Sequence, residues 1–203
     1  LFEEEYGIKV VETTYESNDE LLAKLIAGKE GEYDIAVPTN TYIQAFKDND
    51  LLEEFDAGAI TNLQNIDDAF LNLGYDPENK YSVPYMWSTV GILYDSKKVT
   101  DEVSDMSIMW NEKYKGKIFM LDSVRDSIGM TLKKLGYSVN STEDSELEAA
   151  KSELLTQRPL VLGYVTDEVK DKIISGEGYM GLVYSGEAGK AMSEKDTLKY
   201  AIP

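Results

Sequence analysis

Two runs of alternating apolar and polar positions predict an α/β chain. In the first run, the loosely alternating and β-branched stretch Ile8–Tyr15 is typical of a strand, and apolar residues follow at helical spacing between Leu21 and Ile26. The short apolar stretch Tyr33–Val37 predicts a second, buried strand, followed by a helix over Asn40–Asn49. Strands that alternate with helices through short links indicate βαβ units and a parallel sheet.

The second run lies in the C-terminal half and repeats this alternation. Its predicted elements are a helix at Asp105–Tyr114, a strand at Ile118–Leu121, a helix from Ser123 to a stop at Gly136, a helix at Thr142–Gln157, a strand at Leu160–Val165, a helix at Asp167–Ile174, a strand at Tyr179–Tyr184, a helix from Glu187 and a strand at Leu198–Ile202.

Between the two runs lies the nearly uncharged stretch Tyr81–Asp95, rich in β-branched and aromatic residues that pack well on a pleated surface. We interpret it as a strand that crosses between two α/β lobes, with Trp87 facing the cleft between them. A buried central strand of a single sheet fits this stretch equally well.

Composition narrows the classes of function. The chain of 203 residues has a net charge of −18, which argues against nucleic-acid binding because that needs a basic surface. It contains no cysteine and no histidine, which removes thiolate metal sites, the commonest general base and every Ser-His or Cys-His arrangement. No apolar run approaches the roughly 20 residues that span a bilayer. The opening residues read as the end of a helix, so we expect a piece of a longer protein.

Ligands of open α/β sheets bind where strands end and helices begin. Four such junctions, at residues 37–42, 87–89, 121–126 and 183–187, carry hydroxyl, aromatic or carboxylate groups. At the third junction, Asp126 stands three residues after Ser123, as in a helix capping box. Its carboxylate either caps the helix by bonding backbone N–H groups, which the pattern alone favours, or pairs with an ammonium group. Asp122 is either a turn residue or a ligand. Thr39 is most simply a helix cap, and Tyr42, Trp87 and Tyr184 are either core residues or aromatic walls of a site.

Eight stretches resemble one known family, in order and along nearly the whole chain. They are Tyr6–Val10, Thr14–Asn18, Tyr33–Pro38, Tyr81–Trp87, Trp110, Tyr114–Gly116, Arg125–Asp126 and Lys134–Ser138. The family is that of the spermidine/putrescine-binding receptors of bacterial ABC importers.

The resemblance implies a two-lobed periplasmic binding protein fold of type II that closes on its ligand, with an incomplete first lobe. Residues 1–90 would form part of the first α/β lobe, 91–198 the second lobe, and 199–203 a return crossing toward the first. A family strand with a cleft motif should precede Leu1, and a ligand-gripping segment should follow Pro203.

The resemblance also implies a set of ligand-binding residues. The family's cleft carboxylate after an arginine falls on Asp126, where the family usually has Glu. Its preceding Asp falls on Ser123, which leaves Asp122 as a replacement, and its second-lobe tryptophan falls on Tyr184. The hydroxyl after the Val-Pro pair matches Thr39, and the following aromatic falls near Thr41 or Tyr42. Trp87 completes the expected set.

The expected function is capture of a polyamine outside the cytoplasmic membrane, without catalysis, metal or cofactor. Expected partners are the polyamine and the permease of an ABC importer, with no nucleic acid and a monomeric state. Attachment by a lipid anchor or by fusion to a permease is part of this expectation. The alternatives are the same fold with another solute, such as an amino acid or a metal chelate, a carboxylate-dependent hydrolase, and a plain interaction domain.

Overall fold

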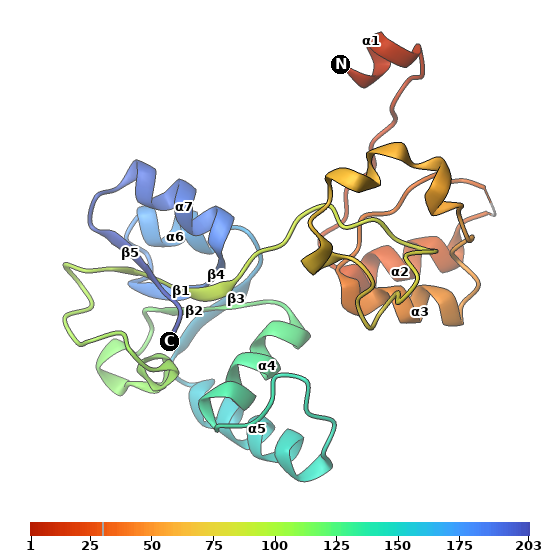
Figure 1. Ribbon diagram of the computed structural model, residues 1–203. Helices are drawn as coiled ribbons and strands as arrows, with labels where there is room; N and C mark the ends of the chain where they lie inside the picture. Colours follow the sequence, from red (N-terminus) through yellow and green to blue (C-terminus); the bar gives the residue numbers. More distant parts are fainter. Residues whose placement is uncertain (30) are drawn as a thin grey trace. The chain divides into compact units, whose positions relative to one another are not determined.

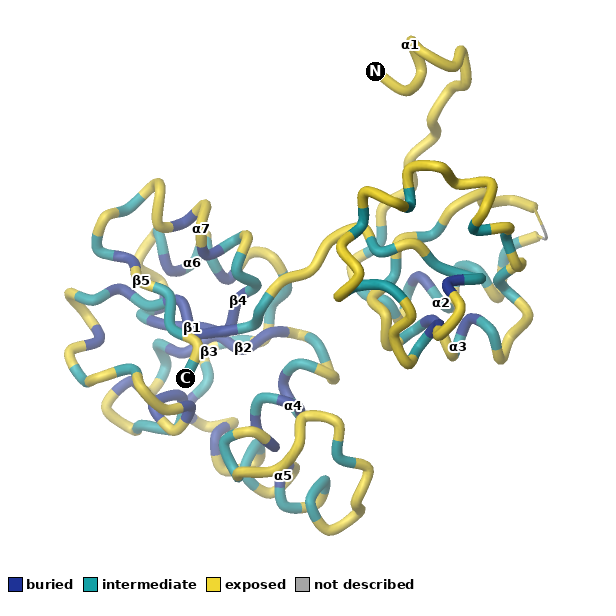
Figure 2. Tube along the Cα trace, viewed as in Figure 1, coloured by how far each residue is buried: buried dark blue, intermediate teal, exposed yellow. Residues whose placement is uncertain are grey.

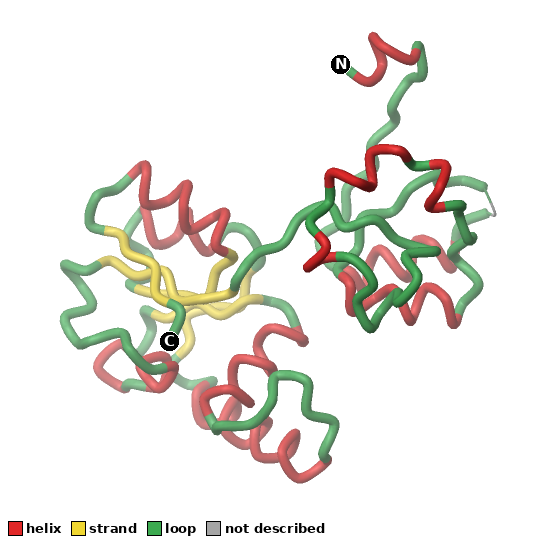
Figure 3. Tube along the Cα trace, viewed as in Figure 1, coloured by secondary structure: helices red, strands yellow, loops and turns green. Residues whose placement is uncertain are grey.

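A computed structural model describes residues 1–29 and 31–203 of the chain. These residues form two compact units, 1–86 and 87–203, which are described separately. The regular elements described in the first unit are helices joined by long loops, whereas strands and helices alternate in the second (Figure 3). In the part of the chain that is described, no helix is long and apolar enough to cross a bilayer.

The first unit is built from short helices. They are α1 (Phe2–Tyr6), α2 (Asn18–Ala27) and α3 (Ile43–Asp48), with 3₁₀ helices at Asn40–Tyr42, Ala57–Ala59, Thr61–Asn65 and Asp68–Phe70. As predicted, Gly7 ends the opening helical turn in the left-handed conformation, with φ 68°. The core of this unit is small, and its buried apolar residues are Leu21, Ile43 and Phe46.

The prediction of two strands in the first unit is wrong. Ile8–Tyr15 and Tyr33–Val37 belong to no strand, with a bend at Asp34, and Ile35 is 82% exposed. The two segments do lie next to each other, because the Tyr15 hydroxyl donates a hydrogen bond to the Val37 carbonyl (2.5 Å). A strand, however, requires backbone hydrogen bonds to a neighbouring strand, and β-branched residues alone do not supply them.

The second unit contains a five-stranded mixed sheet in the order β3-β2-β4-β1-β5. Its strands are β1 (Val90–Asp95), β2 (Ile118–Leu121), β3 (Val161–Val165), β4 (Met180–Tyr184) and β5 (Leu198–Ala201). Strand β2 runs parallel to β3 and β4, and β1 runs antiparallel to β4 and β5. The carboxyl ends of β2, β3 and β4 therefore meet at one edge of the sheet.

The helices of this unit cover both faces of the sheet. They are α4 (Val124–Lys134), α5 (Asp144–Gln157), α6 (Val169–Ile174) and α7 (Ser185–Glu194), with 3₁₀ helices at Met106–Trp110 and Glu112–Tyr114. Figure 1 shows α4 and α5 on one face and α6 and α7 on the other. The helices and strands predicted after Ile118 form with small shifts at their ends, while the predicted helix Asp105–Tyr114 is two 3₁₀ turns.

The crossing strand is shorter than predicted. Only Val90–Asp95 of the stretch Tyr81–Asp95 is a strand. Its ladder with β4 ends at the pair Val90 and Tyr184, because β4 gives way there to α7. Thr89 instead bonds Ser185, the first residue of α7, through its carbonyl oxygen (2.9 Å) and its N–H (3.3 Å).

The end of the chain lies in the sheet of the second unit. Strand β5 pairs with β1 in a register that places Ala201 opposite Ile92. The return crossing of residues 199–203 toward a first lobe stays a prediction.

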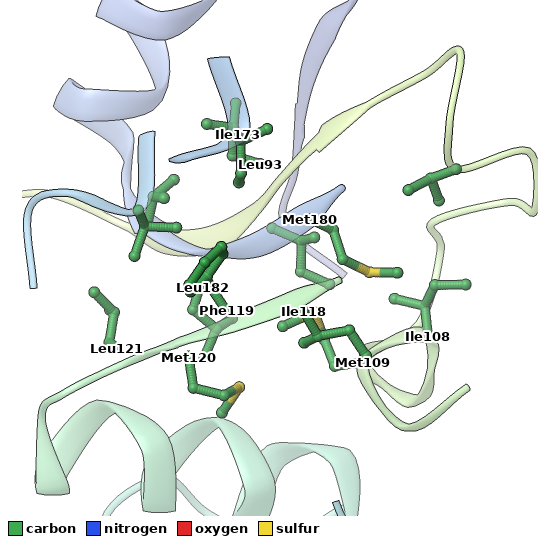
Figure 4. Close-up of a cluster of buried hydrophobic side chains, with 14 of the residues drawn as sticks. Leu93, Ile108, Met109, Ile118, Phe119, Met120, Leu121, Ile173, Met180 and Leu182 are labelled. Carbon is green, nitrogen blue, oxygen red and sulfur yellow. The ribbon is translucent and has the colours of Figure 1, made fainter. Parts of the chain in front are cut away.

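The main hydrophobic core lies in the second unit, around β2 and β4 (Figures 2 and 4). Phe119 of β2 is only 2% exposed, and its ring and backbone occupy space that glycines leave open. A Cβ atom added to Gly178 would lie 2.6 Å from this ring, and one at Gly181 would lie 3.0 Å from the Phe119 Cβ. Such close packing fixes the two strands against each other, and with them the residues at their carboxyl ends.

A partly buried ion pair joins the end of β1 to the residue after α7. Lys195 Nζ lies 2.9 Å from Asp95 Oδ2, and the Asp95 side chain is only 6% exposed. Burial acts to raise the pKa of Asp95, but the hydrogen bonds from Lys195 and from the Lys97 N–H outweigh it and hold this pKa below its usual value. A carboxyl whose pKa is lowered on folding stabilises the fold above its unfolded pKa of about 4, and this contribution is lost as the pH falls through the folded value.

We therefore expect Asp95→Asn to lower the free energy of unfolding by roughly 1–3 kcal/mol at neutral pH. The deficit should shrink toward zero in strong acid, where the wild-type carboxyl is protonated too. Urea unfolding of both proteins at pH 7 and near pH 2.5 measures it. Asp171→Asn, which removes an exposed carboxylate, serves as the control. A deficit that stays constant between the two pH values would contradict this account.

Candidate ligand-binding site

The candidate site begins where β2 ends and α4 starts. Ser123 is the N-cap of α4, and its Oγ accepts a hydrogen bond from the Asp126 N–H (3.3 Å). This is the local arrangement that the Ser-x-x-Asp spacing predicts, and it places Asp126 in the first turn of the helix. The half-buried Asp126 side chain therefore stands at the carboxyl edge of the sheet.

The Asp126 carboxylate is oriented by two hydroxyl groups. Its Oδ2 atom accepts hydrogen bonds from Ser123 Oγ (2.7 Å) and from the Tyr184 hydroxyl (2.7 Å). Its Oδ1 atom has no hydrogen-bond or ion-pair partner among residues 1–29 and 31–203. The carboxylate therefore does not complete a capping box with the Ser123 N–H, and one of its oxygens is left to accept a further hydrogen bond.

Tyr184 is the last residue of β4, and the strand register places it opposite Val90. Burial, the hydrogen bond to Asp126 and the negative charge of that carboxylate raise the pKa of the Tyr184 phenol. The phenol consequently keeps its proton and remains a hydrogen-bond donor throughout the physiological pH range. Its ring contributes an aromatic surface beside the carboxylate.

A small hollow next to Tyr184 gathers residues from the ends of three parallel strands. It is lined by Leu121, Thr166, Asp167, Val183, Tyr184 and Glu187. Thr166, Asp167 and Glu187 were not among the predicted site residues. The rule of strand carboxyl ends, applied to the junction after Val165 as it was to the other junctions, would have found the first two.

Glu187 and Asp122 differ in how strongly their charges are already paired. Glu187 lies 2.7 Å from Lys190 Nζ and 3.4 Å from Lys170 Nζ, and the hydrogen bond from Lys190, the largest influence, holds its pKa below the usual value. Asp122 is exposed, and its backbone N–H donates to the Val165 carbonyl (3.0 Å). Its carboxylate makes no hydrogen bond or ion pair with any residue that the structure describes.

The candidates in the first unit form a cluster of their own. Thr39 Oγ1 lies 3.0 Å from Thr41 Oγ1, and the Thr39 N–H donates to Asn18 Oδ1 (2.9 Å). Thr39 stands at the predicted cap position but makes no capping bond with its side chain. The Tyr42 hydroxyl donates to Asp19 Oδ1 (2.6 Å), and burial, this hydrogen bond and the Asp19 charge raise the pKa of Tyr42 to about 12.

The structure thus brings together three of the eight candidates, Ser123, Asp126 and Tyr184, with Asp122 adjacent in sequence. Thr39, Thr41 and Tyr42 lie in the other unit, and Trp87, at the start of the second unit, is 68% exposed. Within the described ranges, no group of carboxylates is arranged to hold a metal ion.

The fold thus places a cluster of polar side chains at the carboxyl ends of its strands, where α/β proteins commonly bind ligands. The family model of the bacterial extracellular solute-binding proteins matches residues 1–203, and the chain belongs to that family. It is a family of binding proteins rather than of enzymes.

Relatives with similar sequences and structures extend this assignment. The chain is 36% identical to the spermidine/putrescine-binding periplasmic protein of Escherichia coli over 188 residues, which cover 92% of this chain and 54% of the relative. Among solved structures, the substrate-binding protein PotD of a spermidine/putrescine ABC transporter from Streptococcus pneumoniae is 36% identical, with a TM-score of 0.79, and the match covers 100% of this chain and 62% of that one. The TpPotD lipoprotein of Treponema pallidum is 30% identical, with a TM-score of 0.89, over 100% of this chain and 64% of that one.

These figures bear on the predicted fold. The mixed α/β fold of the periplasmic solute-binding proteins is confirmed. The chain spans only about three fifths of the solved structures and 54% of the E. coli relative.

Proposed function

We propose that the protein captures a di- or polyamine, such as putrescine or spermidine, outside the cytoplasmic membrane and delivers it to an ABC importer. The observation that carries the proposal is the Asp126 carboxylate, which is held at the edge of the sheet with Oδ1 open and Tyr184 beside it. The names of the relatives, several of which are spermidine- or putrescine-binding periplasmic proteins, support the same ligand class.

The chemistry of this site suits an ammonium group. A charge-assisted hydrogen bond from an ammonium N–H to a carboxylate oxygen is worth roughly 1.5–3 kcal/mol. An aromatic ring beside it contacts the methylene groups of the ligand and attracts the cation, for about 0.5–2 kcal/mol. The net charge of −18 further favours the approach of a polycation.

The proposal extends to the remaining candidate residues and to the cellular context. Asp122 and Trp87 in the second unit, and Thr39, Thr41 and Tyr42 in the first, are proposed as further ligand contacts. The proposed protein partner is the permease of the importer. Attachment to the membrane, by a lipid anchor or by fusion to the permease, would keep the receptor near that partner.

Calorimetry on the full-length protein tests the proposal. We expect putrescine and spermidine to bind at least tenfold more tightly than 1-aminobutane, because a second ammonium adds a second charge-assisted bond of about 1.5–3 kcal/mol. The uncharged 1,4-butanediol, of the same length as putrescine, should not bind. Binding of an amino acid or of an anionic solute, with no heat from either amine, would overturn the proposed function.

A further inference from the structure

The Asp126 carboxylate presents its two oxygens unequally. A carboxylate has about four lone-pair positions, two on each oxygen. The hydroxyls of Ser123 and Tyr184, each at 2.7 Å, together account for both positions on Oδ2. An incoming ligand therefore meets a single available oxygen, Oδ1.

This asymmetry matters because cationic groups differ in the acceptors they need. A guanidinium group binds a carboxylate best as a fork, with two parallel N–H groups that each reach a different oxygen. An ammonium group is a compact charge that makes a full-strength bond to one oxygen. With Oδ2 occupied, the fork loses one of its two bonds, whereas the ammonium loses nothing.

We propose that the hydrogen bond from Tyr184 to Asp126 makes this site select ammonium ends over guanidinium ends. The inference rests on the proposed function, because it concerns the cation that the same carboxylate receives. Tyr184 acts here as a positioning residue: its hydroxyl fills a lone-pair position that a guanidinium would otherwise use.

Two features of the structure keep the Tyr184 donor in place. The end of β4 fixes its backbone through the pairing with Val90. The phenol also stays protonated at neutral pH, because burial and the neighbouring carboxylate oppose its ionisation. Oδ2 is therefore occupied before any ligand arrives, and the selectivity is built into the ligand-free site.

Calorimetry with two symmetric ligands tests the inference on the full-length protein. Putrescine and 1,4-diguanidinobutane share a four-carbon chain, and either end of each molecule presents the same group to Asp126. We expect the wild type to favour putrescine by roughly tenfold or more, since one strong bond is missing for the guanidinium. In Tyr184→Phe, which keeps the ring but frees a position on Oδ2, this preference should fall by about fivefold or more.

Further variants separate selectivity from structure. Ser123→Gly removes the other donor to Oδ2 and retains a residue that caps helices well, so it should narrow the preference in the same way. Tyr164→Phe, at a partly exposed tyrosine on β3, should leave the preference unchanged.

The inference would be overturned if the ratio of the affinities for putrescine and 1,4-diguanidinobutane stayed unchanged in both Tyr184→Phe and Ser123→Gly. This includes the case in which both variants lose affinity for the two ligands equally. If the wild type bound neither putrescine nor 1,4-diguanidinobutane, the proposed function would be overturned, and the inference with it.

Discussion

Asp126→Asn should lower the affinity of the full-length protein for putrescine at least tenfold, the equivalent of about 1.4 kcal/mol. The substitution keeps the shape of the side chain and an oxygen for the hydroxyls of Ser123 and Tyr184, but it removes the charge that an ammonium pairs with. In the first turn of a helix, asparagine lacks only the favourable interaction of a negative charge with the helix dipole. The free energy of unfolding should therefore change by no more than about 1 kcal/mol. Calorimetry measures the affinity for putrescine, and urea unfolding measures the free energy of unfolding.

The matched control for this prediction is Asp144→Asn. Asp144 also stands in the first turn of a helix, α5, so the variant removes the same charge from a comparable position. Its affinity for putrescine should stay within about twofold of wild type, because the exposed Asp144 carboxylate belongs to another helix and makes no hydrogen bond or ion pair with Ser123, Asp126 or Tyr184. Unchanged affinity in Asp126→Asn, together with a clear loss of stability, would make Asp126 a structural residue only.

Phe119→Ala should lower the free energy of unfolding by roughly 3–5 kcal/mol, the largest effect on stability that we predict. The Phe119 ring packs against the glycines of two neighbouring segments, and a Cβ atom at Gly163 would lie 3.3 Å from it. Glycine has no side chain with which to fill the space that the ring vacates, so the cavity should persist. Urea unfolding followed by circular dichroism measures the loss.

Phe2→Ala is the same substitution at an exposed position of the first unit, where Phe2 is 51% exposed. It should change the free energy of unfolding by no more than about 0.5 kcal/mol. Equal effects of the two substitutions would contradict the placement of the core around β2 and β4.

The helices and strands from Ile118 onward were predictable because their local signals agree with the tertiary contacts that these segments make. The apolar segments predicted as strands at Ile118–Leu121 and Tyr179–Tyr184 pair in one sheet, and α4 begins after its N-cap Ser123, as the spacing indicates. Agreement between local preference and global packing is what makes a segment readable from the sequence.

In the first unit, the local signals predicted two strands that do not form. Ile8–Tyr15 and Tyr33–Val37 have the composition of strands, but a strand forms only when another strand accepts and donates its backbone hydrogen bonds. The Val37 carbonyl bonds the Tyr15 phenol instead. Composition reports a preference for extended backbone and leaves the pairing undetermined.

The sequence singled out Asp126 but did not predict how its carboxylate is oriented. The sequence pattern and the family resemblance both directed attention to Asp126, but the pattern alone favoured a cap bonded to backbone N–H groups. Its orientation depends on Tyr184, 58 positions further along the chain, whose hydroxyl reaches Oδ2 only because the sheet places β2 beside β4. Contacts of this kind follow from the fold and have no signal in local spacing.

A crystal structure of the full-length protein with putrescine tests the central claim most directly. The account predicts an ammonium nitrogen about 2.7–2.9 Å from Asp126 Oδ1, the usual length of a charge-assisted bond. Tyr184 should still donate to Oδ2, with its ring against the methylene chain. A diamine bound elsewhere, with Oδ1 of Asp126 facing solvent, would contradict it.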